Sequence, residues 1–379
     1  MSKILEINTV ADCTNAVGRL MMSLVAELRA QGHGCYVATG RGDFTYVDYR
    51  IGNKLGVYNH YLWSRINDSQ GMHSRSATRG LVKYFKDVNP DVVHLHNLHG
   101  HYLNIELLLN TLAQWGGRVV MTMHDLWWLT GHCTQFDHNG CLPWEENCRD
   151  CSHNDDEYPL SLVSQAERNL NNKRELLNSI RNQLVIVVPT RWMQRSLEQS
   201  YLQGVDCRVI PNGVDTKIFH LPQAGAERSG LLCVAARWSK SKMLDKIVKL
   251  SGETDMAITV VGDLMGNKID TRRIKHIRHL SPSELAVLYQ RSAVLVNPTQ
   301  VESYGMVTVE GLSCGVPVVV NSHCGASVEL MRNGGGVIAD PDDLSLGVEK
   351  ILMGDFEPLL TPPPSLDDMC TAYLEVLGC

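Results

Sequence analysis

Apolar residues occur along this chain in short runs, and each run is followed by a stretch whose apolar residues have helical spacing. That alternation is typical of parallel α/β sheets, in which a buried strand leads through a loop into a helix. In the first half, residues 20–28 carry one such helical face, and Asn15–Gly18 predict the turn before it. The strands predicted for this half are Lys3–Thr9, Tyr36–Thr39, Asp91–His96, Arg118–Met123 and Leu184–Pro189.

The same pattern starts again after a polar stretch with proline and glycine, Leu221–Ser229, which we interpret as a linker. Ser281–Glu284 has the sequence of a capping box with proline at the first helical position, and therefore predicts a helix start. A triple-proline segment precedes the last amphipathic helix, Leu366–Leu377. The other elements predicted here are strands Leu231–Ala236, Ala257–Val261, Val294–Asn297, Val316–Asn321 and Gly336–Ala339, and helices Leu244–Leu250 and Val307–Ser313.

These elements predict an α/β protein with two Rossmann-like, doubly wound parallel-sheet domains that face a cleft. A chain of 379 residues is long enough for two such cores. We expect the domains at residues 1–222 and 223–358, with a cysteine-rich insertion at 131–157 in the first. Residues 359–379 are expected to form a terminal helix that crosses back to the first domain.

The composition narrows the class of protein. Hydrophobic residues make up 44% and charged residues 20% of the chain, which are values of a soluble globular protein. A net charge of -6 argues against nucleic acid as the main partner. The first residues enter a strand without an apolar leader, and no run reaches the roughly 18 apolar residues of a spanning helix. We therefore expect a cytoplasmic protein.

The segment Pro298–Pro317 carries the densest candidate chemistry. Glu302 and Glu310 lie eight positions apart, with Gly305 between them, in a predicted loop and the helix that follows it. The loop starts at the carboxyl end of a predicted strand, which is the edge where open α/β sheets bind ligands. Each carboxylate can accept hydrogen bonds from two hydroxyl groups, so two of them near one ligand indicate recognition of a polyhydroxylated molecule.

Cations follow the first strand of the second domain. Arg237 comes at the end of that strand, and Lys240 and Lys242 come shortly after it. At a strand's carboxyl edge such side chains can hold a diphosphate, and Gly305 and Met306 offer backbone N–H groups at a helix start for the same phosphates. Solvated surface cations are the alternative for each of them taken singly. No Asp-x-Asp sequence ends a strand, so no catalytic divalent metal is expected.

The basic residues and the acidic segment together resemble the donor site of retaining GT-B glycosyltransferases of family four, over almost the whole chain. The positions that carry this resemblance are Arg237, Lys242, Glu302, Glu310, Gly315 and Pro317. The resemblance implies that Glu302 binds sugar hydroxyls, that Glu310 binds the ribose, and that the basic pair binds the diphosphate of a UDP- or GDP-sugar. Two positions depart from the family pattern, because Ala236 and Met243 stand where glycine is usual.

In the first domain the resemblance singles out Gly18 and His124. Gly18 follows the first strand, as does the family's flexible loop near the reacting sugar, although Val17 replaces the first glycine of the usual pair. His124 matches the family's histidine near the donor sugar, where a neutral imidazole hydrogen-bonds a hydroxyl or assists the acceptor. Two further groups of residues have either of two roles, contact with a sugar or packing in the core. One is the histidines His94, His96, His99 and His101, which we do not assign to a metal, and the other is the aromatic residues Tyr102, Trp127 and Trp128.

Four cysteines gather within nineteen positions of the insertion and end in a Cys-x-x-Cys pair. They are Cys133, Cys141, Cys148 and Cys151. This ligand count and softness favour a closed structural zinc site, although the first spacing is not that of a zinc finger. An iron–sulfur cluster and free thiols remain alternatives. The segment also resembles one found in colanic-acid and capsule-type enzymes of the same family.

We therefore predict a retaining glycosyltransferase that uses a nucleotide-diphosphate sugar and a glycan or lipid-linked acceptor, in exopolysaccharide, capsule or O-antigen biosynthesis. An epimerase or sugar-phosphate synthase on the same fold is one alternative, and a non-catalytic, zinc-stabilised nucleotide-sugar-binding protein is another. Residues 1–110 hold eleven Lys/Arg against nine Asp/Glu, and cations from Arg65 to Lys86 lie close to Tyr61, Leu62 and Trp63. That excess permits peripheral contact with the inner face of a membrane, although a solvated helix face is the interpretation that we favour.

Overall fold

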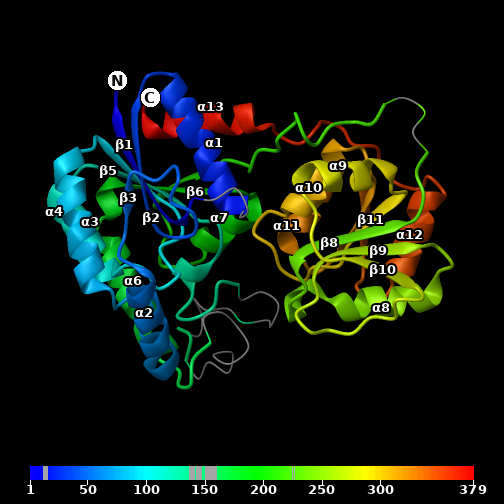
Figure 1. The fold of residues 1–379 in the computed structure, drawn as a ribbon, viewed down its shortest axis with the longest axis horizontal. Helices are drawn as coiled ribbons and strands as arrows, with labels where there is room; N and C mark the ends of the chain where they lie inside the picture. Colours follow the sequence, from blue (N-terminus) through cyan, green and yellow to red (C-terminus); the bar gives the residue numbers. More distant parts are fainter. Residues whose placement is uncertain (12–15, 136–140, 142–146, 150–159, 224, 226) are drawn as a thin grey trace. The chain divides into compact units, whose positions relative to one another are not determined.

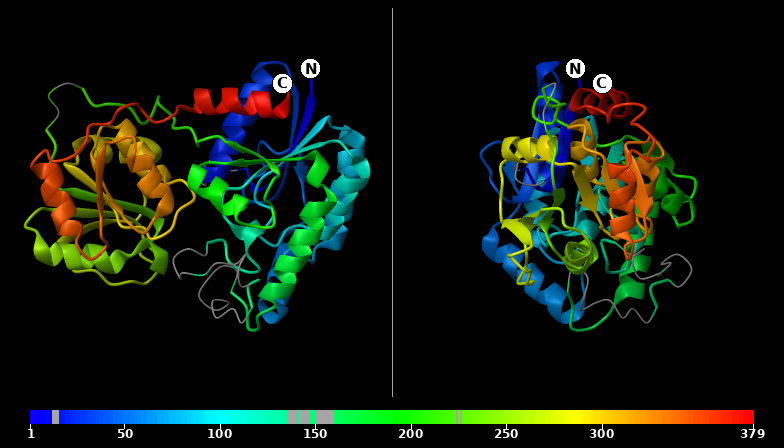
Figure 2. Two further views of the ribbon diagram at one scale, coloured as in Figure 1. Left: turned by 180° about the vertical axis from the view of Figure 1, so that it is seen from behind. Right: turned by 90° about the vertical axis from the view of Figure 1, so that its right-hand side faces the viewer.

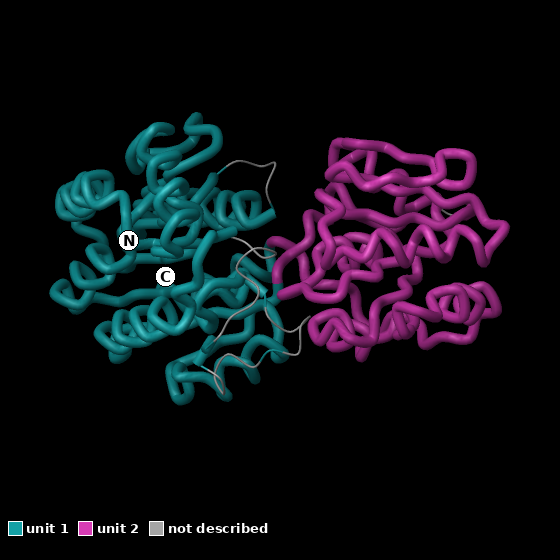
Figure 3. Tube along the Cα trace, turned by 90° about the horizontal axis from the view of Figure 1, so that it is seen from below, with its two compact units in different colours: residues 1–211, 367–379 teal, residues 212–366 magenta. Residues whose placement is uncertain are grey.

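A computed structural model describes residues 1–11, 16–135, 141, 147–149, 160–223, 225 and 227–379 (Figure 1). The chain divides into two compact units, shown in different colours in Figure 3. Unit 1 comprises Met1–Pro211 and Asp367–Cys379, and unit 2 comprises Asn212–Leu366. The first boundary lies before the polar stretch at 221–229, which is part of unit 2.

Unit 1 has a seven-stranded sheet in the order β3-β2-β1-β4-β5-β6-β7, and all of its pairs are parallel. The strand order reverses between β1 and β4. The strands are β1 Lys3–Val10, β2 Gly34–Arg41, β3 Tyr49–Arg50, β4 Val92–Leu95, β5 Arg118–Thr122, β6 Leu184–Val188 and β7 Asp206–Val209. The α-helices are α1 Ala16–Ala30, α2 Lys54–Asn67, α3 Arg75–Val88, α4 Ile105–Trp115, α6 Ala166–Ser179, α7 Arg191–Glu198 and α13 Leu366–Leu377.

Alternate residues of the central strands of unit 1 face opposite sides of its sheet. Leu5, Val93 and Met121 belong to the hydrophobic core that also contains buried residues of α3 and α4. The next residue along each strand, Glu6, His94 or Thr122, points to the other face of the sheet. On that face α13 lies next to α1 (Figures 1 and 2). Tyr373 of α13 is buried there, and its hydroxyl lies 3.0 Å from Oγ1 of Thr122 at the end of β5.

Unit 2 has a six-stranded parallel sheet in the order β10-β9-β8-β11-β12-β13, which reverses between β8 and β11. Helices cover both of its faces. Val318 and Val320 pack into one core with α9 and α10, and Val319 packs into a second core with α8 and α12. The elements are β8 Leu231–Arg237, α8 Leu244–Glu253, β9 Ile258–Asp263, β10 Ile274–Ile277, α9 Pro282–Arg291, β11 Val294–Asn297, α10 Met306–Ser313, β12 Val318–Asn321, α11 Gly325–Met331, β13 Gly336–Ala339 and α12 Leu344–Leu352.

The fold class predicted from the sequence is confirmed: two Rossmann-like, doubly wound parallel sheets, with the last helix packed on unit 1. Ser281 and Glu284 form the predicted capping box at the start of α9. One detail was wrong, because Ala16–Gly18 are not a turn but the first residues of α1. The short edge strands β3, β7 and β10 were not predicted; the two-residue β3 is too short to carry an alternating pattern.

The two segments that connect unit 2 to unit 1 lie side by side within unit 2. Val214 N–H donates to Pro364 O, and Leu366 N–H donates to Val214 O, at 2.9 and 3.0 Å. A Cβ on Gly213 would lie 2.5 Å from the carbonyl oxygen of Ser365, so only glycine allows this approach of the two backbones.

Candidate functional site

In unit 2, the loops that follow β8 and β11 form the candidate donor site. The backbone N–H of Gln300 donates to Ser241 O at 2.9 Å and so joins the two loops. Lys242 Nζ donates to Glu302 Oε1 at 2.7 Å, and the two side chains are 27% and 10% exposed. β8 and β11 are the strands between which the order reverses, the position where open α/β sheets bind ligands.

One carboxylate oxygen of Glu302 accepts no hydrogen bond from the described residues. Its Oε2 is buried and has no hydrogen-bond partner among the described residues, although buried polar atoms are nearly always hydrogen-bonded. Gly305 precedes α10 with φ of +98°, and a Cβ there would lie 2.7 Å from this oxygen. Glycine at 305 therefore makes room for the carboxylate at the start of α10, where the first backbone amides lack an intrahelical acceptor.

The other residues predicted for the donor site lie on the same loops or on the elements next to them. Arg237 ends β8 with an exposed side chain, and Glu310 lies within α10 with 5% exposure. Met243, which stands where the resembling family has glycine, has a left-handed backbone with φ of +53° and ψ of +49°. The loop thus keeps a conformation that glycine would adopt freely, and a methionine there costs roughly 1–2 kcal/mol.

In unit 1 a cavity of about 410 Å³ opens where the strand order reverses between β1 and β4. Its walls include Thr9, Asn97 and His99 from the strand ends and loops, and Val17 beside Gly18 in the first turn of α1. Thr9 Oγ1 lies 2.9 Å from the carbonyl oxygen of Asn97. The loops that follow β1 and β4 are thereby held together around the cavity.

His124, just beyond β5, is half-buried and belongs to a hydrogen-bonded chain with two buried side chains, which the sequence did not single out as a unit. Its Nε2 lies 2.9 Å from His96 Nδ1, and His96 Nε2 lies 2.8 Å from Glu6 Oε2. Burial acts to raise the pKa of the Glu6 carboxyl, but its interactions with His94 and His96 outweigh this effect and hold the pKa at about 2. Burial lowers the pKa of His96 to about 4 and the pKa of His124 well below its usual value. Both of these imidazoles are therefore neutral at pH 7.

The histidines of residues 94–101 separate into three environments. His94 and His96 converge on Glu6, and with it they are the only group of three potential metal ligands within the described ranges. His99 Nε2 lies 2.7 Å from a carboxylate oxygen of Asp125 and joins the loops that follow β4 and β5. His101 packs edge-on against other rings.

The aromatic residues considered for sugar stacking are part of the core instead. Tyr102, Trp127 and Trp128 are 1%, 0% and 3% exposed, and all three belong to the main core of unit 1. Their rings are thus covered by protein, and a stacked sugar would have to displace core residues. Core filling is the role that their burial supports.

The cysteine insertion is described only in part, because Cys151 lies outside the described residues. Cys133 and Cys148 are buried, and Gly131 N–H lies 3.2 Å from Cys148 Sγ. Among the residues that the structure describes, Cys133, Cys141 and Cys148 do not bring three sulfur atoms within ligand distance of one another. A four-thiol zinc site therefore stays a prediction.

Family models cover most of the chain. The model described as Glycosyltransferase Family 4 matches residues 17–218, and the model described as Glycosyl transferases group 1 matches residues 226–357. Among curated proteins, the putative colanic acid biosynthesis glycosyl transferase WcaC of Escherichia coli (strain K12) is 24% identical over 313 residues, which are 76% of this chain and 71% of WcaC.

The fold is also found in solved structures of other proteins. Sucrose-phosphate synthase from Thermosynechococcus elongatus has a TM-score of 0.66 and 14% identity, over 100% of this chain and 95% of that one. Anabaena HepE in complex with UDP and glucose has a TM-score of 0.65 and 14% identity, over 100% of both chains. At this level of identity the likeness concerns the fold.

Proposed function

The chain belongs to glycosyltransferase family 4 and is a glycosyltransferase with the GT-B fold, and from this premise we propose a retaining transfer from a UDP- or GDP-sugar. The acceptor we propose is a glycan or a lipid-linked oligosaccharide in the assembly of a surface polysaccharide. The name of the Escherichia coli relative, which refers to colanic acid, supports the pathway. The donor type is supported by HepE, whose structure contains UDP and glucose.

The observation that carries this proposal is the ion pair between Lys242 and Glu302. It places a cation and a carboxylate with an unused oxygen beside the start of α10. A nucleotide sugar has the matching groups, because its diphosphate accepts from Lys242, Arg237 and backbone amides while its sugar hydroxyls donate to Glu302. We assign Glu310 to the ribose of the same donor.

The proposed reaction exchanges one bond at the anomeric carbon. The bond to the diphosphate oxygen breaks while the acceptor hydroxyl forms its bond on the same face of the sugar, and its proton passes to the departing phosphate. Negative charge grows on the diphosphate as it leaves. Arg237, Lys242 and the amides of Gly305 and Met306 would stabilise that charge in the transition state.

A paired variant experiment tests this proposal. Glu302→Gln keeps the shape of the side chain but removes the charge that Lys242 and the sugar use, whereas Glu349→Gln makes the same change on an exposed position of α12. A donor at 100 times its Kd should stabilise the wild type by about 2.7 kcal/mol. We expect this stabilisation, measured as a shift in Tm with a series of UDP- and GDP-sugars, to disappear only in Glu302→Gln. No shift of the wild type with any donor would refute the proposal.

Incubation of the donor without acceptor separates this function from the alternatives. An epimerase would return an isomerised nucleotide sugar, and a sugar-phosphate synthase would consume the donor only after a phosphorylated sugar was added. A non-catalytic nucleotide-sugar-binding protein would show the Tm shift but no release of UDP or GDP with any acceptor. Release of nucleotide that depends on a glycan acceptor is the result we expect.

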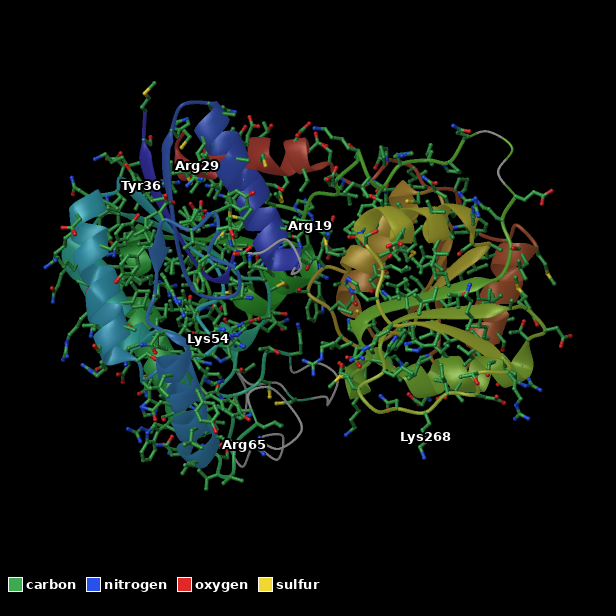
Figure 4. The ribbon with its side chains drawn as sticks, in the orientation of Figure 1. Arg19, Arg29, Tyr36, Lys54, Arg65 and Lys268 are labelled. Atoms are coloured by element: carbon green, nitrogen blue, oxygen red, sulfur yellow. The ribbon has the colours of Figure 1, made fainter. Side chains whose placement is uncertain are left out.

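We also propose that α2 contacts the membrane surface that carries a lipid-linked acceptor. α2 has no acidic residue, Lys54 and Arg65 lie near its two ends (Figure 4), and large apolar side chains are exposed along it. The exposed apolar residues are Leu55, Tyr58, Tyr61, Leu62, Trp63 and Ile66. Such a helix binds anionic lipid through its apolar face and its cations. No described helix is long and apolar enough to cross a bilayer.

Sedimentation with vesicles tests this contact. We expect binding to vesicles that contain phosphatidylglycerol and little binding to pure phosphatidylcholine. Trp63→Ser should weaken the binding, whereas Leu346→Ser, which removes an exposed apolar side chain from α12, should not. Equal loss in both variants would contradict the assignment to α2.

A further inference from the structure

The side chains of Glu6, His96 and His124 form a hydrogen-bonded chain across β1, β4 and the end of β5. The two links measure 2.8 and 2.9 Å, and the rings of His96 and His124 differ in plane by 12°. Glu6 and His96 are 0% and 4% exposed. The chain starts in the interior of unit 1 and ends at His124, for which we propose a contact with the sugar or the acceptor.

The chemistry of each group fixes the direction of every bond in this chain. An ionised carboxylate only accepts, so His96 must donate from Nε2 to Glu6. A neutral imidazole has one N–H, so Nδ1 of His96 is then an acceptor. His124 must therefore donate from Nε2 to His96, and its own proton is used in this bond. Nδ1 of His124 is left as a bare acceptor, and it has no hydrogen-bond partner among the described residues.

A second branch uses the remaining bonding capacity of Glu6 and does not reach His124. His94 Nδ1 lies 2.9 Å from Glu6 Oε2, and His94 Nε2 lies 2.8 Å from Thr122 Oγ1. Tyr373 of α13 continues this branch through its contact with Thr122. The carboxylate thus accepts from two imidazoles, and neither can turn its N–H elsewhere without leaving a buried polar atom unpaired.

A metal ion does not account for the same group of residues as well. The distances between their facing nitrogen and oxygen atoms, 2.8 to 3.1 Å, are those of hydrogen bonds. A tetrahedral zinc ion with ligands at about 2.0 Å would hold its ligand atoms about 3.3 Å apart.

We propose that Glu6 and His96 are positioning residues that hold the proton of His124 on Nε2, so that Nδ1 accepts a hydrogen bond from a hydroxyl of the bound sugar or acceptor. This inference rests on the proposed function, because it assumes that the chain binds a sugar and that His124 contacts it, as the family resemblance implies. It deepens that function by stating what the site selects: a group that donates a hydrogen bond, and not one that only accepts.

Ring ¹⁵N NMR of the protein labelled on histidine tests the tautomer without any ligand, with His124→Gln used to assign the signals. In the wild type we expect a pyrrole-type signal from Nε2 of His124 and a pyridine-type signal from Nδ1. Glu6→Gln offers His96 either an amide N–H or a carbonyl, so we expect His124 to change to the other tautomer or to a mixture. Tyr373→Phe is the control: it removes a hydroxyl from the other branch and should leave the tautomer unchanged.

Activity measurements then test whether the tautomer of His124 affects the rate of sugar transfer. We expect Glu6→Gln to lower kcat/KM at least about tenfold, which corresponds to about 1.4 kcal/mol of lost interaction in the transition state. A donor or acceptor whose contacting hydroxyl is replaced by fluorine should react no better than the deoxy analogue, because fluorine cannot donate to a bare nitrogen. This comparison uses only the wild type, and it keeps the proposal testable if Glu6→Gln does not fold.

An N–H on Nδ1 of His124 in the wild type would overturn the inference, and so would a tautomer that Glu6→Gln leaves unchanged. A fluorinated analogue that restores the rate lost with the deoxy analogue would also overturn it. These failures are distinct from failure of the proposed function. A protein that transfers no sugar could still show the predicted tautomer, and an active glycosyltransferase could show the opposite one.

Discussion

Replacement of Gly305 by alanine is the most selective perturbation of the candidate donor site. Two effects are expected in Gly305→Ala. The backbone at φ of +98° lies outside the region that residues with a side chain favour, and the new Cβ would lie 2.7 Å from Glu302 Oε2. The second contact is to the far end of a flexible side chain, so the carboxylate can move away. When it moves, it leaves its hydrogen bond with Lys242.

Gly354→Ala is a matched control in the same unit. Gly354 has φ of +76°, and nothing lies within 4 Å of a Cβ built on it. Both variants therefore introduce backbone strain of roughly 1–2 kcal/mol, which lowers Tm by about 2–4 °C per kcal/mol for a domain of this size. Only Gly305→Ala also moves a carboxylate of the candidate site.

The two variants should consequently differ in donor binding and not in stability. Loss of a hydrogen bond to a charged group costs about 1.5–3 kcal/mol, which corresponds to donor binding that is roughly ten to a hundred times weaker. Isothermal titration with the preferred UDP- or GDP-sugar measures Kd, and calorimetric unfolding measures stability. If Gly305→Ala binds the donor as tightly as Gly354→Ala does, Glu302 does not contact the donor in the way proposed.

Three further predictions follow from the site and its surroundings. Lys242→Ala should raise the KM for the donor at least about tenfold, because it removes a phosphate contact and leaves Glu302 without its partner. The control Lys268→Ala changes an exposed residue of unit 2 (Figure 4) and should leave KM unchanged. Elemental analysis should find about one zinc per chain, as expected for one four-thiol site. The zinc should be lost in Cys148→Ser but kept in Cys379→Ser, since Cys379 is exposed and outside the insertion. Absence of zinc from the wild type would refute the site. The free energy of unfolding should fall by about 1.4 kcal/mol per pH unit as the pH drops from about 6.5 toward 4. Burial lowers the pKa of His60 to about 2, so the unfolded chain takes up a proton at this residue and the folded protein does not. Denaturant unfolding of His60→Asn should show a shallower dependence on pH.

The place of the candidate donor site in the fold could be predicted from the sequence, because its acidic residues are close together in the chain. Glu302, Gly305 and Glu310 lie within nine positions, and a loop at the end of an apolar strand brings them to one edge of the sheet. The contact between Lys242 and Glu302 joins loops sixty positions apart. The sequence predicted that both residues lie at one edge of the sheet, but it did not predict the ion pair between them. Nothing in the sequence shows that Gly305 is needed to leave room for a carboxylate.

The chain from Glu6 to His124 could not be predicted in the same way. Its members lie on β1 and just beyond the ends of β4 and β5, which are far apart in sequence, and each strand by itself is typical of a buried strand with an occasional polar residue. A signal was present, since polar residues alternate with apolar ones at the ends of all three strands, as in Glu6 with Asn8 and His94 with His96. That pattern indicates one polar face. Which atoms meet on the face depends on strand register, which periodicity does not determine.

The stability of the fold does not by itself explain why Glu6 is charged at the centre of the sheet in unit 1. Burial of a carboxylate costs several kcal/mol, and replacement of a buried charged group and its partners by apolar residues of similar volume is often neutral or stabilising. The opposite face of the same strands is filled by such apolar residues, Leu5 and Val93 among them. What the carboxylate does supply is an acceptor that cannot donate, and this property alone sets the direction of the hydrogen bonds that end at His124. A serine or an amide at position 6 would leave that direction open. The buried charge is therefore better explained by the state of the imidazole at the edge of the sheet than by the packing of the core beneath it.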